Sequence, residues 1–168
     1  MTAETLPRYG VVPIDVVTRG TGLAFLQAMI ARTHPAPPFA GTTDIWLAVA
    51  EHGRVVFEAD PSERFLNPLG IVHGGWISTL LDSAMGCAVH STLRPGNGYT
   101  TVDMTVTFVR AVSPASGRLT CEGKIVHSGK RIASAEGRVF DATGKLMAHG
   151  TETCMILKIP TAGDTGVD

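Results

Sequence analysis

The stretch NPLGIVHGGWISTLLDSAMGCAV, residues 67–89, decides the fold of this chain. It opens with turn-forming residues, reaches the triplet His73-Gly74-Gly75, and continues as a long apolar run that contains one carboxylate, Asp82. The pattern predicts a helix over residues 75–90 with apolar side chains around most of its circumference, so we expect it to be buried. A carboxylate in a buried helix loses its solvation, and this costs free energy unless the carboxylate is paired or takes part in function. Asp82 is therefore the first candidate for a functional residue.

Strand-like segments flank this helix on both sides. Residues 44–50 and 54–59 predict two strands joined by a tight turn. Beyond the helix-breaking run 94–98, four further strands are predicted, at residues 99–112, 118–126, 131–140 and 146–157. Their connections are short and rich in turn formers, so we expect consecutive strands to pair antiparallel. In the first of the four, Val102 and Met104 are predicted to face one way, and Thr101 and Asp103 the other.

This order of elements predicts an α+β fold in which a curved antiparallel sheet wraps around one long central helix. We expect an N-terminal extension over residues 1–43, irregular up to about residue 20, with one short helix that ends before the proline-rich run 34–38. The main domain is predicted at residues 44–159 and a flexible tail at 160–168. Several strands are apolar on both faces, which suggests that two sheets meet in an oligomer.

Composition excludes several function classes. The formal net charge of -1 argues against a nucleic-acid partner, and no run of about 18 apolar residues predicts a membrane helix. The N-terminus lacks a secretory pattern, and the three cysteines are widely spaced, so we expect a cytoplasmic protein without disulfides. No histidine has ligand-like spacing to cysteines or carboxylates, so we predict no metal.

The central stretch combines groups suited to acyl chemistry. The free N–H groups of Gly74 and Gly75 at the helix start can bind an anion or polarise a carbonyl. Asp82 can act as a general base or nucleophile, while Asn67 and His73 offer hydrogen bonds. Gly75 and Asp82 lie about 10 Å apart along a helix axis, which is far for a single carbonyl. Two helices side by side in a dimer would bring such groups together.

The motif Asn67-x5-His73-Gly74-Gly75-x6-Asp82 resembles that of hot-dog-fold acyl-CoA thioesterases of the phenylacetate-pathway (PaaI) type, and the resemblance covers residues 44–157. It implies a homodimer or homotetramer whose active sites are shared between subunits. It also implies that the Gly74 N–H polarises the thioester carbonyl and that Asp82 activates water or attacks directly. Asn67 and His73 would support the site, and Thr101 would help to place the attacking water. Related 4-hydroxybenzoyl-CoA thioesterases carry Glu and Gln in place of Asp82 and Asn67, so the base and nucleophile mechanisms both stay open.

The resemblance implies an acyl-CoA substrate and no cofactor other than the coenzyme A that the substrate carries. The residues expected at the substrate are Gly75 at the helix start, Trp76 and Met85 along the helix as acyl-pocket candidates, and Lys130 and Arg131 at the phosphates. Each has a plainer structural reading. Trp76 and Met85 can be ordinary core residues, and Lys130 and Arg131 can be solvated surface residues. The two glycines at the helix start can mark a close contact between helix and strand.

Structural readings also exist for the polar residues of the motif. Asp82 can cap neighbours such as Ser78 or Ser83, and His73 can orient its loop through a backbone hydrogen bond. Two further functions stay open beside the thioesterase. One is a non-catalytic acyl-CoA or lipid-binding protein. The other is an enoyl-CoA hydratase, which is disfavoured because its Asp–His pair has no counterpart near the helix start.

Overall fold

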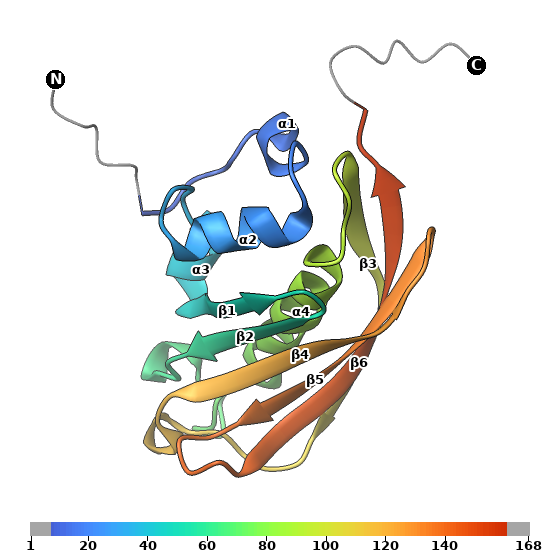
Figure 1. Ribbon diagram of the computed structural model, residues 1–168. Helices are drawn as coiled ribbons and strands as arrows, with labels where there is room; N and C mark the ends of the chain where they lie inside the picture. The colour runs from blue at the N-terminus through green and yellow to red at the C-terminus, as the bar shows by residue number, and fades with distance from the viewer. Residues whose placement is uncertain (1–7, 161–168) are drawn as a thin grey trace, which may run out of the picture.

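The computed structural model describes residues 8–160, in which a six-stranded antiparallel sheet wraps around the long helix α4 (Gly74–His90) (Figure 1). This arrangement confirms the predicted α+β hot-dog fold. The order across the sheet is β1-β2-β4-β5-β6-β3. The strands are β1 (Ile45–Glu51), β2 (Arg54–Ala59), β3 (Asn97–Phe108), β4 (Leu119–Ser128), β5 (Ile132–Phe140) and β6 (Leu146–Lys158).

The expected pairing of β3 with β4 is wrong, because β3 pairs with β6 and forms one edge of the sheet. Strand β3 ends at Phe108 and not at residue 112, so the connection to β4 runs over the ten residues 109–118. That length exceeds a hairpin loop and lets the chain cross from one edge to the middle of the sheet. The crossing keeps all six strands in one curved sheet, and every strand contacts α4, in which nine residues are buried.

From residue 8 onward, three helices precede the sheet, where the sequence predicted one. The predicted helix is α2 (Gly22–Ile30), capped by the Thr21 hydroxyl, which accepts from the Ala24 N–H at 3.2 Å. The short helices α1 (Ile14–Val17) and α3 (Pro38–Thr43) were missed. Helix α2 ends at Ile30, two residues before Arg32 in the left-handed conformation (φ 58°). The proline-rich run begins α3, because proline is compatible with the first position of a helix. Helix α2 packs against β1 (Figure 1). The predicted tail lies, apart from Pro160, outside the described residues.

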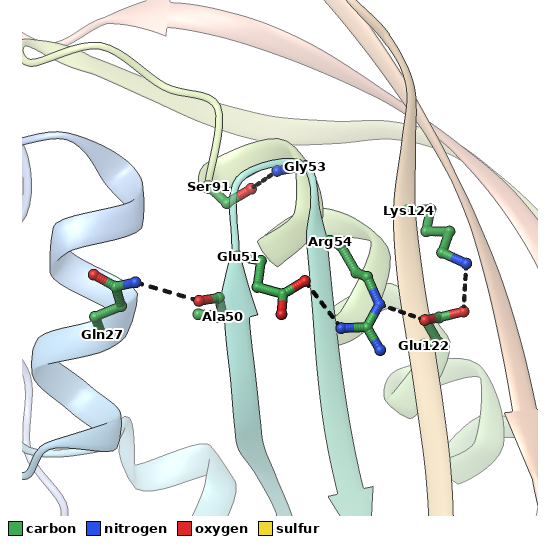
Figure 2. Close-up of polar contacts among 8 residues, drawn as sticks. All are labelled: Gln27, Ala50, Glu51, Gly53, Arg54, Ser91, Glu122 and Lys124. Atoms are coloured by element: carbon green, nitrogen blue, oxygen red, sulfur yellow. Dashed lines mark hydrogen bonds and ion pairs between the residues drawn. The ribbon is translucent and has the colours of Figure 1, made fainter.

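Polar contacts fix the β1–β2 hairpin against its neighbours (Figure 2). Gln27 of α2 donates to a carbonyl of β1 at 3.4 Å, and the Gly53 N–H in the hairpin turn donates to the Ser91 hydroxyl at the end of α4 at 2.8 Å. Arg54 of β2 forms an ion pair with Glu122 of β4. The hairpin is therefore tied to both helices and to the rest of the sheet.

A β-bulge in β3 changes the predicted alternation of its side chains. Thr101 pairs with Cys154 and Asp103 with Thr153, so Val102 has no partner in the ladder and is 56% exposed. Thr101 therefore faces α4, and Met104 beyond the bulge also packs against the core around this helix. The prediction that Thr101 and Met104 face opposite ways is wrong, because one extra residue shifts the phase of a strand.

A row of glycines lets α4 lie close to the sheet. Gly123 of β4 pairs with Gly137 of β5, which pairs with Gly150 of β6. A Cβ atom on Gly123 would lie 2.2 Å from the Ala84 carbonyl oxygen of α4, and one on Gly137 would lie 2.9 Å from the Met85 side chain. The helix backbone at Gly123 and a helix side chain at Gly137 thus occupy the space that a sheet side chain would fill, whereas Gly150 lies close to the backbone of β3.

We predict that Gly123→Ala lowers the free energy of unfolding by about 1–3 kcal/mol, because the new methyl group meets helix backbone that cannot turn aside. Gly20→Ala is the matched control, since its Cβ would lie at an ordinary 3.9 Å from Ala24. Chemical denaturation of both variants measures the effect. Equal stability of the two variants would contradict the close approach of helix and sheet.

Candidate active site

His73 caps the start of α4 and leaves one backbone donor available. Its Nδ1 accepts from the Gly75 N–H at 2.9 Å, and its carbonyl accepts from the Trp76 N–H at 3.0 Å. The His73 N–H itself donates to the Phe65 carbonyl at 2.7 Å, which holds the loop in place. Within residues 8–160 no acceptor faces the Gly74 N–H. The cap therefore occupies Gly75 and leaves Gly74 as the donor at the positive end of the helix dipole.

The loop before His73 is organised by Asn67. The Asn67 side-chain oxygen accepts from the Leu69 N–H at 2.9 Å and from the Ile71 N–H at 3.4 Å. Its backbone N–H donates to the Ile71 carbonyl at 2.8 Å. Asn67 therefore shapes the turn that leads the chain into α4.

Gly74 lies beneath an aromatic ring of the edge strand. A Cβ atom there would lie 3.1 Å from the Phe108 ring, which is itself 51% exposed. Because Gly74 has no Cβ atom, a narrow gap between Gly74 and the Phe108 ring lets a ligand approach the Gly74 N–H group.

Asp82 is half-buried on α4, two turns beyond Gly74. Its Oδ1 accepts from the Thr101 hydroxyl at 3.2 Å, so the bulged strand brings these two predicted residues together. Ser78 is not capped by Asp82, because its hydroxyl donates to the Gly74 carbonyl at 2.9 Å. The Asp82 carboxylate is thus held by one hydroxyl and remains open on its other side, where it lines a cavity.

A second carboxyl group, Glu152 of β6, lies on the other side of Thr101. Its Oε1 is 2.8 Å from the Thr101 hydroxyl, and the side chain is only 2% exposed. Burial raises the pKa of Glu152, and the charge of Asp82 adds to the rise. The motif does not include this residue, although strand alternation carries a signal: Glu152 shares the inward face of β6 with Gly150 and Cys154.

Asp82 lies in the wall of a cavity of about 810 Å³. Much of the remaining wall is apolar and comes from the N-terminal helices and from β1, including Met29, Ile30, Phe39, Trp46 and Leu47. The extension expected to lie outside the main domain therefore helps to form the candidate site. At the α4–β3 end of the cavity, the polar wall residues are Asp82, Ser83, Cys87 and Tyr99. The N-terminal segment adds the polar wall residues Arg8, Arg32 and His34.

Trp76 and Met85, the expected acyl-pocket residues, lie in the core. The Trp76 ring stacks on Phe65 at 5.0 Å, and its Nε1 donates to the Thr43 carbonyl at 2.7 Å. Met85 is fully buried and packs against Gly137. Neither side chain lines the cavity at Asp82.

Cys87 is the other group at this end of the cavity with nucleophilic potential. Burial is the main cause that raises the pKa of its thiol to about 12, and the nearby carboxylate of Asp82 acts in the same direction. The thiol is therefore protonated at neutral pH and is a poor nucleophile. Asp82 remains as the candidate for base or nucleophile.

A second cavity, of about 590 Å³, lies at the carboxyl end of α4 and is lined by Arg94, Lys130 and Lys158. Over residues 8–160, none of these cations forms an ion pair with a carboxylate. Arg131 does not line this cavity, and its carbonyl accepts the Ile156 N–H at 2.8 Å. Lys130 thus has two basic neighbours, Arg94 and Lys158, that are distant from it in the sequence.

Within the described part of the chain, no three His, Cys, Asp or Glu side chains are arranged to hold a metal ion. In the same residues, no helix is long and apolar enough to cross a membrane.

The geometry of α4 limits what one chain can do alone. Gly74 and Asp82 are eight residues apart, which is about 12 Å along the helix axis. A reacting carbonyl should lie about 3 Å from both its donor and its attacker. A single helix therefore does not bring both groups to one carbonyl.

Comparison with known proteins agrees with this fold. The family model described as the thioesterase superfamily matches residues 69–148. Human acyl-coenzyme A thioesterase 13 is 33% identical over 112 residues, which cover 65% of this chain and 77% of that protein. The crystal structure of a phenylacetic acid degradation-related protein from Ralstonia eutropha JMP134 has a TM-score of 0.71 and 27% identity, covering 77% of this chain and 98% of that one.

A structure from Streptococcus mutans UA159, described as bound to acetyl CoA, has a TM-score of 0.63 and 24% identity over 70% of this chain and 91% of that one. At this identity the similarity shows the fold alone. Taken with the family model and the relatives above, the chain belongs to the thioesterase superfamily, whose members hydrolyse thioesters. The resemblance to the PaaI type is confirmed.

Proposed function

We propose that this protein hydrolyses an acyl- or aryl-CoA thioester to the free acid and coenzyme A, with Asp82 as general base or nucleophile. The observation that carries the proposal is the Asp82 carboxylate, held on one side by Thr101 and open on the other to a cavity with apolar walls. The Gly74 N–H is the donor that would polarise the thioester carbonyl. His73 and Asn67 hold that donor in place through the cap and the loop.

Two mechanisms fit these groups. As a base, Asp82 takes a proton from water, the hydroxide adds to the carbonyl carbon, and the C–S bond then breaks to release the thiolate, which takes up a proton. As a nucleophile, Asp82 adds to the same carbon and expels the thiolate, leaving a mixed anhydride that water hydrolyses. In both, negative charge on the carbonyl oxygen is stabilised by the Gly74 N–H.

We propose that Gly74 of one subunit and Asp82 of another act on the same carbonyl in a homodimer or a dimer of dimers. Edge strand β3 supports this, since it pairs with β6 on one side and, within residues 8–160, has no strand on the other. It also carries exposed apolar side chains, including Val102 and Phe108. A long apolar edge strand favours association with another chain.

The apolar walls of the cavity suit an apolar acyl or aryl group. We propose no cofactor beyond the coenzyme A portion of the substrate. The human relative is named an acyl-coenzyme A thioesterase, and the Streptococcus mutans structure is described with acetyl CoA. We also propose a cytoplasmic location, because Cys87, Cys121 and Cys154 are free thiols and suit a reducing compartment.

We place the coenzyme A phosphates at the second cavity. Arg94, Lys130 and Lys158 gather there at the end of α4 without carboxylate partners among the described residues. Asp82 and Ser91 are nine residues apart, so this end of the helix lies about 14 Å from the catalytic carboxylate along the axis. In an acyl-CoA substrate, the extended pantetheine arm likewise separates the thioester from the phosphates, as the helix separates Asp82 from the second cavity.

The competing function is a non-catalytic acyl-CoA or lipid-binding protein. It would use the same cavities but leaves the Thr101-held Asp82 without a role. A hydratase is disfavoured because, in the described part of the chain, no histidine forms a hydrogen bond with Asp82.

We predict that Asp82→Asn lowers kcat for thiol release from acyl- and aryl-CoA esters by about 10²–10⁴-fold and leaves the fold intact, because the amide cannot accept a proton. Asp15→Asn is the control, since it removes only an exposed ion pair with Arg19. If Asp82→Asn stays within about tenfold of the wild type, Asp82 is not the catalytic group. Binding of CoA esters without turnover by the wild type would favour the binding protein.

We predict that Lys130→Gln raises KM for CoA esters by about tenfold with little change in kcat, as expected for loss of a charge-assisted contact worth about 1.4 kcal/mol. Lys145→Gln is the matched control at an exposed cation elsewhere. The same acyl group on pantetheine, which lacks the phosphates, should show no effect of Lys130→Gln. An equal rise in KM for the pantetheine ester would place the phosphates elsewhere.

A further inference from the structure

Glu152 is a buried carboxyl group that the mechanism above does not use. Its Oε1 lies 2.8 Å from the Thr101 hydroxyl and accepts from the Cys154 thiol at 3.0 Å. Its Oε2 is buried and has no hydrogen-bond partner among residues 8–160, and no cation in that part of the chain forms an ion pair with Glu152. An ionised carboxylate in such surroundings is strongly disfavoured.

The number of hydrogens shared by Thr101 Oγ1, Asp82 Oδ1 and Glu152 Oε1 limits which of these groups are ionised. The Thr101 hydroxyl has one hydrogen to donate, yet it lies within hydrogen-bond distance of Asp82 at 3.2 Å and of Glu152 at 2.8 Å. If both carboxyl groups were ionised, one of these contacts would join two acceptors with no hydrogen between them. Both contacts are satisfied when one of the two carboxyl groups carries a proton.

Burial decides which group carries it. Glu152 is 2% exposed, whereas Asp82 lines an open cavity where water and substrate can solvate its charge. The proton therefore belongs on Glu152, and the hydrogen bonds run in one direction, from Glu152 to Thr101 and from Thr101 to Asp82.

We infer that Glu152 is a positioning residue, which remains protonated in the active enzyme and donates to the Thr101 hydroxyl so that this hydroxyl donates to Asp82. The inference rests on the proposed role of Asp82. The bulge at Val102 supports it, because the bulge turns Thr101 toward the helix while the rest of β3 keeps its pairing with β6. Asp82 is thereby held through Oδ1, and its other oxygen is left for the reaction.

Loss of the Glu152 proton reverses this arrangement. The Thr101 hydroxyl then donates to the nearer Glu152, and Asp82 loses its donor and gains a buried negative charge beside it. The groups that face Glu152 are Asp82 and Cys87 of α4, Tyr99 and Thr101 of β3, and Cys154 of β6, whereas β5 presents alanines. Burial raises the pKa of Cys87 to about 12 and also raises the pKa values of Tyr99 and Cys154. These three groups stay neutral while Glu152 titrates.

The test compares the pH dependence of kcat for thiol release between pH 5 and pH 10, corrected for spontaneous hydrolysis. We expect the wild-type kcat to fall on the alkaline side. Glu152→Gln keeps an amide donor but cannot ionise, so its kcat stays within about threefold at neutral pH and the alkaline fall disappears. Glu152→Met and Thr101→Val, which break the chain of hydrogen bonds, lower kcat about tenfold with little change in KM.

Stability gives a readout that does not depend on catalysis. Because the pKa of Glu152 is raised in the folded state, its contribution to stability is present at low pH and is lost as pH rises through that pKa. We expect Glu152→Gln to gain stability relative to the wild type as pH rises, measured by chemical denaturation at pH 5 and pH 9. A stability difference independent of pH overturns the inference.

The inference is also overturned if the wild-type profile has no alkaline fall, if Glu152→Gln retains that fall, or if Glu152→Gln is as impaired as Glu152→Met at neutral pH. Its failure is separable from failure of the proposed function. An active Asp82→Asn variant refutes the role of Asp82 itself. An inactive Asp82→Asn variant together with an unchanged pH profile in Glu152→Gln refutes only the role of Glu152.

Discussion

The close approach of α4 to the sheet is the constraint on which the rest of the structure depends. At Gly123, a single added carbon would lie 2.2 Å from the helix backbone, and Gly137 on the next strand is similarly tight. Because the helix is pressed against the middle of the sheet at these glycines, its buried side is filled by residues such as Leu81 and Met85. Asp82 then points toward β3 and the cavity. The position of the carboxylate is thus a consequence of packing along the whole helix.

The second constraint is the separation of donor and carboxylate along one rigid helix. The His73 cap uses the Gly75 N–H and leaves that of Gly74, while Asp82 lies two turns away. We therefore propose that hydrolysis at one carbonyl uses two copies of α4, and the open edge of β3 offers a place for a second chain to join. In this account the oligomer is part of the active site, because each subunit supplies one half of the chemistry.

Much of the fold follows from local patterns in the sequence. The apolar run after His73 predicts α4 to within a residue at its start, and residues 54–59 form the predicted strand. The pairing of β3 with β6 and the bulge at Val102 were not predicted, because both depend on how the sheet closes around the helix and not on local alternation. Of the candidate site, the motif predicts Asp82 and the Gly74 donor, and the family resemblance adds Thr101. Glu152 was missed because a lone glutamate in a strand usually lies at the surface, and only the tertiary structure shows it buried behind Thr101.

The most direct test of shared active sites mixes two inactive variants. Asp82→Asn removes the carboxylate. Gly74→Pro removes the N–H at a helix position that accepts proline, and His73 before it already has the extended ψ of 131° that a following proline requires. Gly74→Ala is the control, because it adds a Cβ and keeps the donor. If sites are shared, mixed dimers contain one intact site of two, so an equal mixture of the variants refolded together regains about a quarter of wild-type thiol release. No gain in activity over the separate variants would contradict the shared site.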